Sequence, residues 1–423
     1  MTRLSNASGT AGQDGAAAER GAGLPAGGTD VVCLGESMVT FLPSRPGRLA
    51  DVPSFDRAIG GAESNVACVL AAAGHRVRWV SRVGADGFGD HLVAAIAAHG
   101  VDTGHVARDP HRPTGVYFRT AGERATGADG EEPGTAEVVY YRAGSAASAM
   151  TPGSPGPAAL AGARVLHLTG ITAALSDSCL DVLRTLTRRT PGRPLVSFDV
   201  NYRVGLWQGR PQGPETLLDL ARGADVVFVG EDEAAAAWDL HGPEAIRAAL
   251  PEPGVLVVKQ GSEGVTVLHR EGGDGRDGGE AGDAGDAAGA GATAPAAHPV
   301  AAAPAALADT PAAHPGAAAP TPDTLTYAPA LTVDVIASVG AGDAFAAGFL
   351  SGTLRGLPVF DRIRHGHLMA AAALTVPGDL AVPPPRALAD RLAALPADDW
   401  GRLRLGPGWT TGLHDARVEV PQT

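Results

Sequence analysis

The chain has 423 residues, and 46 acidic side chains outnumber 33 basic ones, so its formal net charge is −13 at pH 7. Because no basic stripe is present that could displace the counterions of a polyanion, we expect no nucleic-acid partner. The sequence contains no run of about 18 apolar residues free of charges and breakers, and its first residues lack the apolar core of a signal peptide. We therefore expect no membrane segment and a cytoplasmic protein.

Two segments have compositions that oppose folding. Residues 1–29 are small, polar and rich in Gly and Ala, and residues 271–323 contain almost no large apolar side chain. Neither segment can bury enough surface to offset its ordering entropy, so we predict a disordered N-terminal tail and a disordered insertion. The insertion can be a passive linker or a partner-binding region. For the remaining sequence we predict one domain over 30–400, which contains the insertion, and a C-terminal tail over 401–423.

Short apolar runs alternate with helical patterns along this domain. In chain order, strands are predicted at 31–34, 77–83, 165–168, 195–200, 225–229 and 255–259, and helices at 64–73, 90–99, 341–353 and 362–376. Two further strands, at 265–268 and 325–330, are expected to pair across the insertion. This alternation predicts an α/β fold with a doubly wound, mostly parallel sheet and helices on both faces. Such sheets bind ligands at the carboxyl ends of their strands.

Two stretches interrupt this rhythm, at about 37–57 and 110–142. The second holds the alternating segments GVYFRT and EVVYYR around a Gly-rich loop, which favours a small antiparallel excursion. Together the two stretches predict a small β lid at the ligand-binding edge. The three cysteines, Cys33, Cys68 and Cys179, lack paired spacing, which argues against disulfides or a zinc site and favours a reducing compartment.

The stretch from Gly340 to Gly348 carries the strongest chemical signal. Gly340, Ala341 and Gly342 precede a helix-forming run, so backbone N–H groups at a helix start can bind an anion there. Asp343 adds a carboxylate beside that anion site. It can be a helix-capping residue. Alternatively, it is a base that takes a proton from a hydroxyl while the N–H groups hold the charge on a transferred phosphoryl group.

Four ordered motifs surround this stretch: GGAESNVA at 60–67, GADGFG at 84–89, KQGSEG at 259–264 and GAGDAFAAGF at 340–349. With them, the chain resembles the ribokinase-like (PfkB) carbohydrate kinases over about residues 30–385. The resemblance implies the ribokinase-like fold with a β lid, ATP as donor, Mg²⁺, and transfer to a sugar hydroxyl with Asp343 as catalytic base. The P-loop motif and the protein-kinase signatures do not occur in the sequence.

Four details resemble the 2-keto-3-deoxygluconate kinase branch of that family: GESM at 35–38, GGAESN at 60–65, YYRAGSA at 140–146 and DVNYR at 199–203. The resemblance implies that Gly61 and Asn65 bind sugar hydroxyls and that Tyr117 and Tyr140 contact the sugar from the lid. It also implies that Arg142 and Arg203 hold the acid end. Arginine suits that role because its planar, permanently charged fork pairs with a carboxylate in bidentate fashion.

Each of these residues also has a structural interpretation. The Gly60–Gly61 pair can be only a turn before a helix. Tyr141, which alternates with Tyr140 along a strand, is the tyrosine we expect to pack within the lid. Arg203 can instead pair with Asp199 or with an acid of an adjacent loop.

On the nucleotide side, the resemblance implies that Lys259, Gly261, Ser262 and Gly264, together with Ala341 and Gly342, contact ATP. Glu233 falls where the family carries the Glu of an Asn-x-x-Glu motif that organises Mg²⁺ waters, but Gly230 replaces the Asn. The acids around Glu233 can equally be the first turn of a helix.

The chain departs from the family just before GAGD, where the usual Asp-Thr pair is replaced by Ala337-Ser338. Since that Asp helps to ligate an activating monovalent cation in the family, we predict weak or absent K⁺ activation. The expected reaction is ATP-dependent phosphorylation of 2-keto-3-deoxygluconate to its 6-phosphate. A fructokinase or another sugar kinase, and a non-catalytic sugar-acid binding protein, are the alternatives. The expected partner is thus a small sugar acid, and the sequence leaves a homo-oligomer open.

Overall fold

The computed structural model describes residues 28–45, 47–120, 137–154, 156–210, 212–270 and 322–411. Most of the two segments predicted to be disordered, and residues 412–423, lie outside the described residues. No helix among the described residues is long and apolar enough to cross a membrane.

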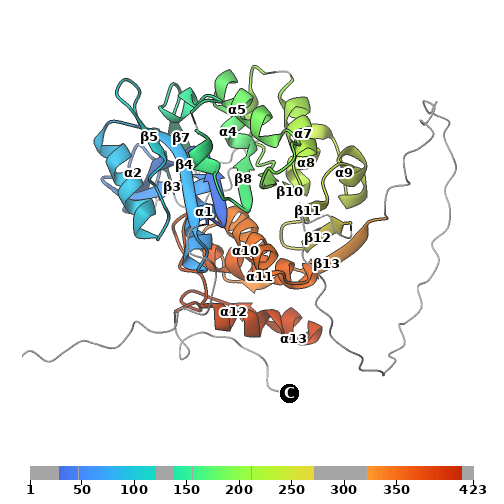
Figure 1. Cartoon of the computed structure of the whole chain (residues 1–423). Coiled ribbons are helices and arrows are strands. Elements are labelled where there is room, and N and C mark those ends of the chain that lie inside the picture. The colour runs from blue at the N-terminus through green and yellow to red at the C-terminus, as the bar shows by residue number, and fades with distance from the viewer. Residues whose placement is uncertain are drawn as a thin grey trace, which may run out of the picture.

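A nine-stranded sheet forms the centre of the domain (Figure 1). Its strand order is β13-β12-β11-β10-β9-β8-β1-β4-β5. The seven strands from β11 to β5 run parallel, whereas β12 and β13 are antiparallel to their neighbours. The strands are β1 Val31–Leu34, β4 Val77–Gly84, β5 Val106–Asp109, β8 Val165–Thr169, β9 Leu195–Asp199, β10 Val226–Gly230, β11 Val255–Lys259, β12 Gly264–His269 and β13 Thr324–Pro329. The predicted mostly parallel sheet, and the pairing of β12 with β13 across the insertion, are confirmed.

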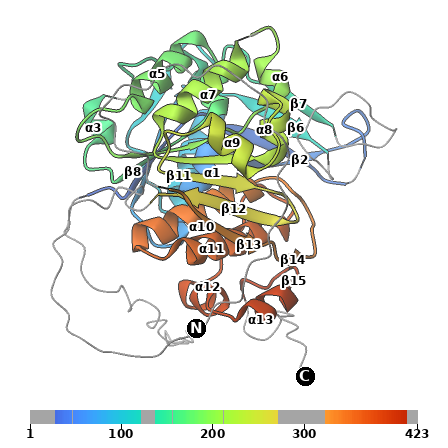
Figure 2. The same cartoon turned by 90° about the vertical axis from the view of Figure 1, so that its right-hand side faces the viewer.

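Helices cover both faces of this sheet (Figure 2). Helices α1 (Ala62–Ala72), α2 (Gly87–Ala98), α10 (Ala341–Arg355) and α11 (Val359–Leu374) pack on one face. Helices α4 (Gly170–Ala174), α5 (Asp177–Thr187), α7 (Gly213–Gly223), α8 (Glu231–Trp238) and α9 (Pro243–Ala249) pack on the other. Shorter elements are η1 (Ala147–Ala149), α3 (Pro157–Leu160) and α6 (Val204–Trp207).

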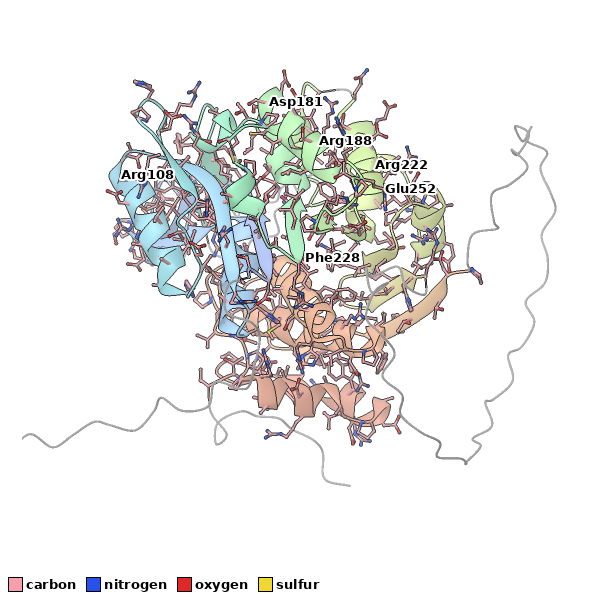
Figure 3. All side chains as sticks on the ribbon, in the orientation of Figure 1. Arg108, Asp181, Arg188, Arg222, Phe228 and Glu252 are labelled. Carbon is pink, nitrogen blue, oxygen red and sulfur yellow. The ribbon has the colours of Figure 1, made fainter. Side chains whose placement is uncertain are left out.

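Strand residues divide between these two layers because successive side chains point to opposite faces. In β1, Val31 and Cys33 join one apolar core while Val32 and Leu34 join the other. Phe228, labelled in Figure 3, packs edge-on against Phe349 of α10, with ring centroids 5.5 Å apart. Burial on both faces explains why these strands read as continuous apolar runs in the sequence.

A separate four-stranded sheet forms the lid, in the order β3-β2-β6-β7. Its strands are β2 Met38–Pro43, β3 Phe55–Gly60, β6 Val116–Arg119 and β7 Val138–Tyr141. Strands β6 and β7 pair antiparallel, but β2 and β6 pair parallel. The antiparallel pairing predicted for the second lid stretch is confirmed by β6 and β7. The lid as a whole is mixed, because β4, α2 and β5 separate β2 and β3 from β6 and return the chain in the same direction.

The folded domain extends past the boundary expected at residue 400. Helices α12 (Arg386–Ala393) and α13 (Ala397–Arg402) are followed by β15 (Arg404–Leu405), which pairs with β14 (Thr332–Val333). Leu403, Leu405 and Trp409 are buried in a third apolar cluster with Trp400. Residues 401–411 were expected in a tail, and this expectation is wrong because their apolar side chains complete that cluster.

Candidate active site

Helix α10 begins at the carboxyl ends of the central strands. Its N-cap, Gly340, has φ 77°, and a Cβ there would lie 2.2 Å from the carbonyl oxygen of Asp379. Only glycine accommodates both the positive φ and this close approach. A Cβ on Gly342 would lie 3.6 Å from Lys259 Nζ, the last residue of β11. The unpaired N–H groups of the first helical turn and a lysine cation thus meet at one place.

Asp343 lies in the first turn of α10 and is held from a neighbouring helix. Asn65 of α1 donates a hydrogen bond from Nδ2 to Asp343 Oδ2 at 2.9 Å. The carboxylate therefore does not act as a side-chain cap of its own helix. Burial raises the pKa of Asp343 to about 7, while the Asn65 hydrogen bond and the charges of Arg203 and Lys259 oppose the rise. A carboxyl group with such a pKa is suited to general base catalysis near neutral pH.

Lys259 is anchored beside Asp343 by Asp199, the last residue of β9. The distances from Lys259 Nζ to the two carboxylate oxygens of Asp199 are 3.1 and 3.2 Å. Burial alone would lower the pKa of Lys259, but the carboxylates of Asp199, Glu233 and Asp343 raise it. Lys259 therefore stays positively charged at the point where the α10 amides could hold a phosphoryl group.

Arg203 and Glu233 pair with each other at the edge of this group. Arg203 Nη1 donates to Glu233 Oε1 at 3.3 Å, and Glu233 Oε2 accepts the N–H of Gly230 at 2.9 Å. Arg203 thus contacts an acid of an adjacent element, Glu233 rather than Asp199. Glu233 also caps its own helix, α8. Among the described residues, no cluster of three or more His, Cys, Asp or Glu side chains could hold a metal ion.

The lid side of the site carries the second arginine. Arg142 forms an ion pair with the buried Glu36, and the Ser145 hydroxyl donates to Glu36 Oε1 at 2.6 Å. The guanidinium group of Arg142 lies 5.7 Å from the ring centroid of Tyr140, and Tyr140 stacks on Tyr117 at 5.3 Å. Of the two arginines, Arg203 is the one whose charge acts on Asp343, whereas the contacts of Arg142 are with Glu36 and with Tyr140 of the lid.

Tyr141 lies on the opposite face of the lid. Its ring packs edge-on against Phe118, with centroids 6.0 Å apart, and Phe118 stacks on Phe41. The face that carries Tyr117 and Tyr140 is the one whose Tyr117 hydroxyl contacts Asp379.

The three other glycines predicted at the site differ in their surroundings. A Cβ on Gly61 would lie 2.6 Å from the carbonyl oxygen of Glu36, and one on Gly264 would lie 2.4 Å from the carbonyl oxygen of Ala328. These two glycines are required by backbone packing. Gly261 has φ 59° with nothing within 4 Å of a Cβ, and with the exposed Ser262 it forms an open turn after β11.

Two acids of the site, Glu36 and Asp379, were not predicted from the sequence. Glu36 lies in the GESM segment after β1, which resembles the family branch but indicates no partner for this acid. Asp379 accepts the Tyr117 hydroxyl at 2.5 Å and pairs with Arg119 at 2.8 Å. No sequence pattern around Asp379 indicates these partners.

Glu63, in the first turn of α1 and two residues before Asn65, is fully buried. The hydroxyls of Thr169 and Thr172 donate to its Oε1 at 2.9 and 2.7 Å. Burial raises the pKa of Glu63 from 4.5 to about 7, although these two hydrogen bonds oppose the rise. The folded protein therefore holds this proton more tightly than the unfolded chain does.

This difference predicts that Glu63 lowers stability as the pH rises. The wild-type free energy of unfolding should fall between about pH 4.5 and 7, by up to about 3 kcal/mol, and stay lower above pH 7. Glu63→Gln keeps an acceptor oxygen but cannot ionise, so it should match the wild type at pH 5 and exceed it at pH 8. Urea unfolding at both pH values measures this, with the exposed Glu215→Gln as control. A Glu63→Gln effect that is equal at both pH values would contradict the assignment.

Comparisons with known proteins agree with this geometry. The model of the pfkB family carbohydrate kinases matches residues 28–297 and 314–385. The 2-dehydro-3-deoxygluconokinase of Bacillus subtilis is 30% identical over 357 residues, which is 83% of this chain and 91% of that protein. The enzyme of the same name from Thermoproteus tenax is 33% identical over 245 residues, covering 57% of this chain and 72% of its own length.

Two further relatives complete the comparison. Fructokinase-1 of rice (Oryza sativa subsp. japonica) is 33% identical over 205 residues, which is 48% of this chain and 60% of that protein. The crystal structure of a PfkB protein from Polaromonas sp. JS666 aligns with a TM-score of 0.63 and 31% identity, covering 86% of this chain and 99% of that one. With the family model matching most of the chain and Asp343 at the start of α10, this chain belongs to the pfkB family of carbohydrate kinases.

Proposed function

We propose that this kinase transfers the γ-phosphoryl group of ATP to the terminal hydroxyl of a small sugar acid, 2-keto-3-deoxygluconate, and so forms its 6-phosphate. The observation that carries the proposal is the meeting of Asp343, the α10 amides, Lys259 and Arg203 at the carboxyl ends of the strands. The B. subtilis and T. tenax relatives, which carry the name of such an enzyme, support the choice of substrate.

In the proposed mechanism, the hydroxyl oxygen of the sugar bonds to the γ-phosphorus of ATP while Asp343 accepts the hydroxyl proton. The bond between the γ-phosphorus and the oxygen that leaves with ADP breaks in the same step. The N–H groups of Gly340, Ala341 and Gly342 hold the charge that develops on the transferred phosphoryl group, and Lys259 adds its positive charge there. Asn65 keeps the carboxylate oriented through its 2.9 Å hydrogen bond. These roles are mainly positioning and electrostatic stabilisation, as phosphoryl transfer requires.

On the substrate side, we assign the acid end to Arg203 and Arg142. Each guanidinium group already has a carboxylate partner, Glu233 and Glu36 respectively, and each retains further N–H donors for a substrate carboxylate. Gly61 and Tyr140 are proposed to complete the sugar pocket, while the open turn of Gly261 and Ser262 is proposed to meet the nucleotide. Gly264 supports this turn by allowing the close approach of β13.

Mg²⁺ fits this site only with the help of the nucleotide. Glu233 is the acid proposed to contact metal-bound water, yet both of its oxygens already have partners, Gly230 and Arg203. The ion would therefore be held mainly by phosphate oxygens and water, as Mg²⁺ commonly is in kinases.

A substrate panel tests the proposal. ATP-dependent ADP release is measured with keto acids and with neutral ketoses, and the phosphorylated position is identified by NMR. We expect a strong preference for 2-keto-3-deoxygluconate. Faster turnover of fructose would instead support a fructokinase, to which the rice relative points, and absence of turnover with every sugar would support a non-catalytic binding protein.

We predict weak or no activation by K⁺. Ala337 lies where the family carries a ligating Asp, and its side chain has no oxygen. Asp334, three residues earlier, is fixed beside β15 because its N–H donates to the carbonyl oxygen of Leu405 at 2.9 Å. The kcat should therefore be equal in potassium chloride and in choline chloride of the same ionic strength. A clear stimulation by K⁺ would contradict this prediction.

We also propose a cytoplasmic location. The support is that Cys33, Cys68 and Cys179 are buried thiols that form no disulfide with one another, as is usual in a reducing compartment.

A further inference from the structure

Asp379 lies at the junction of the lid, the sugar-binding turn and the start of α10. It belongs to the segment that links α11 to α12, and only 6% of its surface is exposed. Asp379 thus comes from a connection between two helices, whereas Asp199 and Lys259 are the last residues of strands β9 and β11.

The carboxylate of Asp379 binds two residues of lid strand β6. Tyr117 donates its hydroxyl to Asp379 Oδ2 at 2.5 Å, and Arg119 Nη2 lies 2.8 Å from Oδ1. Arg119 also donates to the carbonyl oxygen of Pro377 at 3.1 Å. The side chains of Tyr117, Arg119 and Asp379 are all buried, so water does not compete for their polar atoms. These contacts are therefore stronger than the same contacts at a surface. One strand of the lid is thereby fastened to the segment after α11.

The same residue touches both glycine turns of the site. A Cβ on Gly60, directly before Gly61 and α1, would lie 2.6 Å from Asp379 Oδ2 and 2.1 Å from the Tyr117 hydroxyl. A Cβ on Gly340 would lie 2.2 Å from the carbonyl oxygen of Asp379. The side chain of Asp379 thus packs against the turn before α1, and the backbone of Asp379 packs against the turn before α10.

We propose that Asp379 is a positioning residue that couples lid placement to the α10 anion site, and that Tyr117 acts through Asp379 rather than by binding the sugar with its hydroxyl. The buried 2.5 Å contact commits the Tyr117 hydroxyl to this carboxylate. A shift of β6 would move Asp379, and through its backbone it would move Gly340. The proposal rests on the kinase activity of the family but not on which sugar is phosphorylated.

A double-mutant cycle of Tyr117→Phe and Asp379→Asn tests this coupling. The assay uses whichever sugar the wild type phosphorylates fastest, so a wrong choice of sugar acid does not affect the result. Tyr117→Phe keeps the ring stacked on Tyr140 and removes only the hydroxyl. We expect each single variant to lower kcat/KM about tenfold, with a raised sugar KM as well as a lowered kcat. The double variant should be no worse than Asp379→Asn alone.

Tyr141→Phe is the matched control, because Tyr141 lies on the other face of the lid and its side chain is exposed. It should leave both kinetic constants unchanged. If Asp379→Asn does not fold, Arg119→Lys takes its place in the cycle, since Arg119 acts on the same carboxylate.

Three results would overturn the proposal. The first is unchanged kinetics in Tyr117→Phe. The second is a double variant whose loss equals the product of the two single losses, which would mean that Tyr117 contacts the sugar independently. The third is a fall in kcat without a change in sugar KM, since a purely structural role only reduces the fraction of active enzyme.

Discussion

Asp343→Asn is expected to lower kcat by about 10²–10⁴-fold, the contribution typical of a positioned general base. Asparagine has nearly the same shape and can still accept the hydrogen bond from Asn65, but it cannot take a proton at neutral pH. The KM for the sugar should change little, because the hydrogen-bonding oxygen remains. Steady-state ADP release at saturating substrate measures the effect.

Asp177→Asn is the matched control for this variant. Asp177 also lies in the first turn of a helix, α5, but its side chain is 97% exposed and pairs with Arg210. It should retain wild-type kcat. If Asp343→Asn keeps more than about a tenth of the wild-type kcat, another group must remove the proton, and the assignment of the base is wrong.

Arg203→Ala is expected to separate acidic from neutral sugars. A charge-assisted pair with a substrate carboxylate contributes about 1.5–3 kcal/mol, so the KM for the keto acid should rise roughly 10- to 100-fold. The KM for a neutral ketose should hardly change. Arg203→Lys should recover only part of the loss, because an ammonium group cannot form the bidentate contact.

Arg184→Ala on α5 controls for loss of an arginine as such, since the ion pair that Arg184 forms within the described part of the chain is with Asp181, one helical turn away. It should leave both KM values unchanged. If Arg203→Ala instead raises the KM of the acid and of the ketose by the same factor, Arg203 supports the site through Glu233 and does not recognise a carboxylate.

The central sheet could be predicted because its signal is local. Segments such as Val226–Gly230 and Val255–Lys259 are apolar throughout, which is the pattern of a strand buried on both faces. The parallel pairing of β2 with β6 could not be predicted in this way. It depends on where the crossover through β4, α2 and β5 returns the chain, and the alternating pattern of β6 and β7 is the same in either direction.

The site shows the same division between local and distant information. Asp343 could be identified because the glycines before it mark a helix start, whereas Asn65 was indicated by the resemblance of its motif to that of the family. The partners of the charged side chains could not. Tyr117 and Asp379 are 262 residues apart, and the sequence around Asp379 differs little from an ordinary loop. Likewise, the sequence left the acid partner of Arg203 open and indicated no acid partner for Arg142, and the packed structure pairs them with Glu233 and Glu36.

The pH dependence of kcat/KM tests most directly whether Asp343 deprotonates the acceptor hydroxyl. The wild-type value should rise with pH to a plateau through an apparent pKa of about 7, because only the carboxylate form can act as base. Asn65→Leu removes the hydrogen bond that favours the carboxylate, so its rise should move to higher pH. ATP ionises identically in both assays, and the difference between the two profiles therefore reports the enzyme. Two profiles that rise at the same pH would contradict the account.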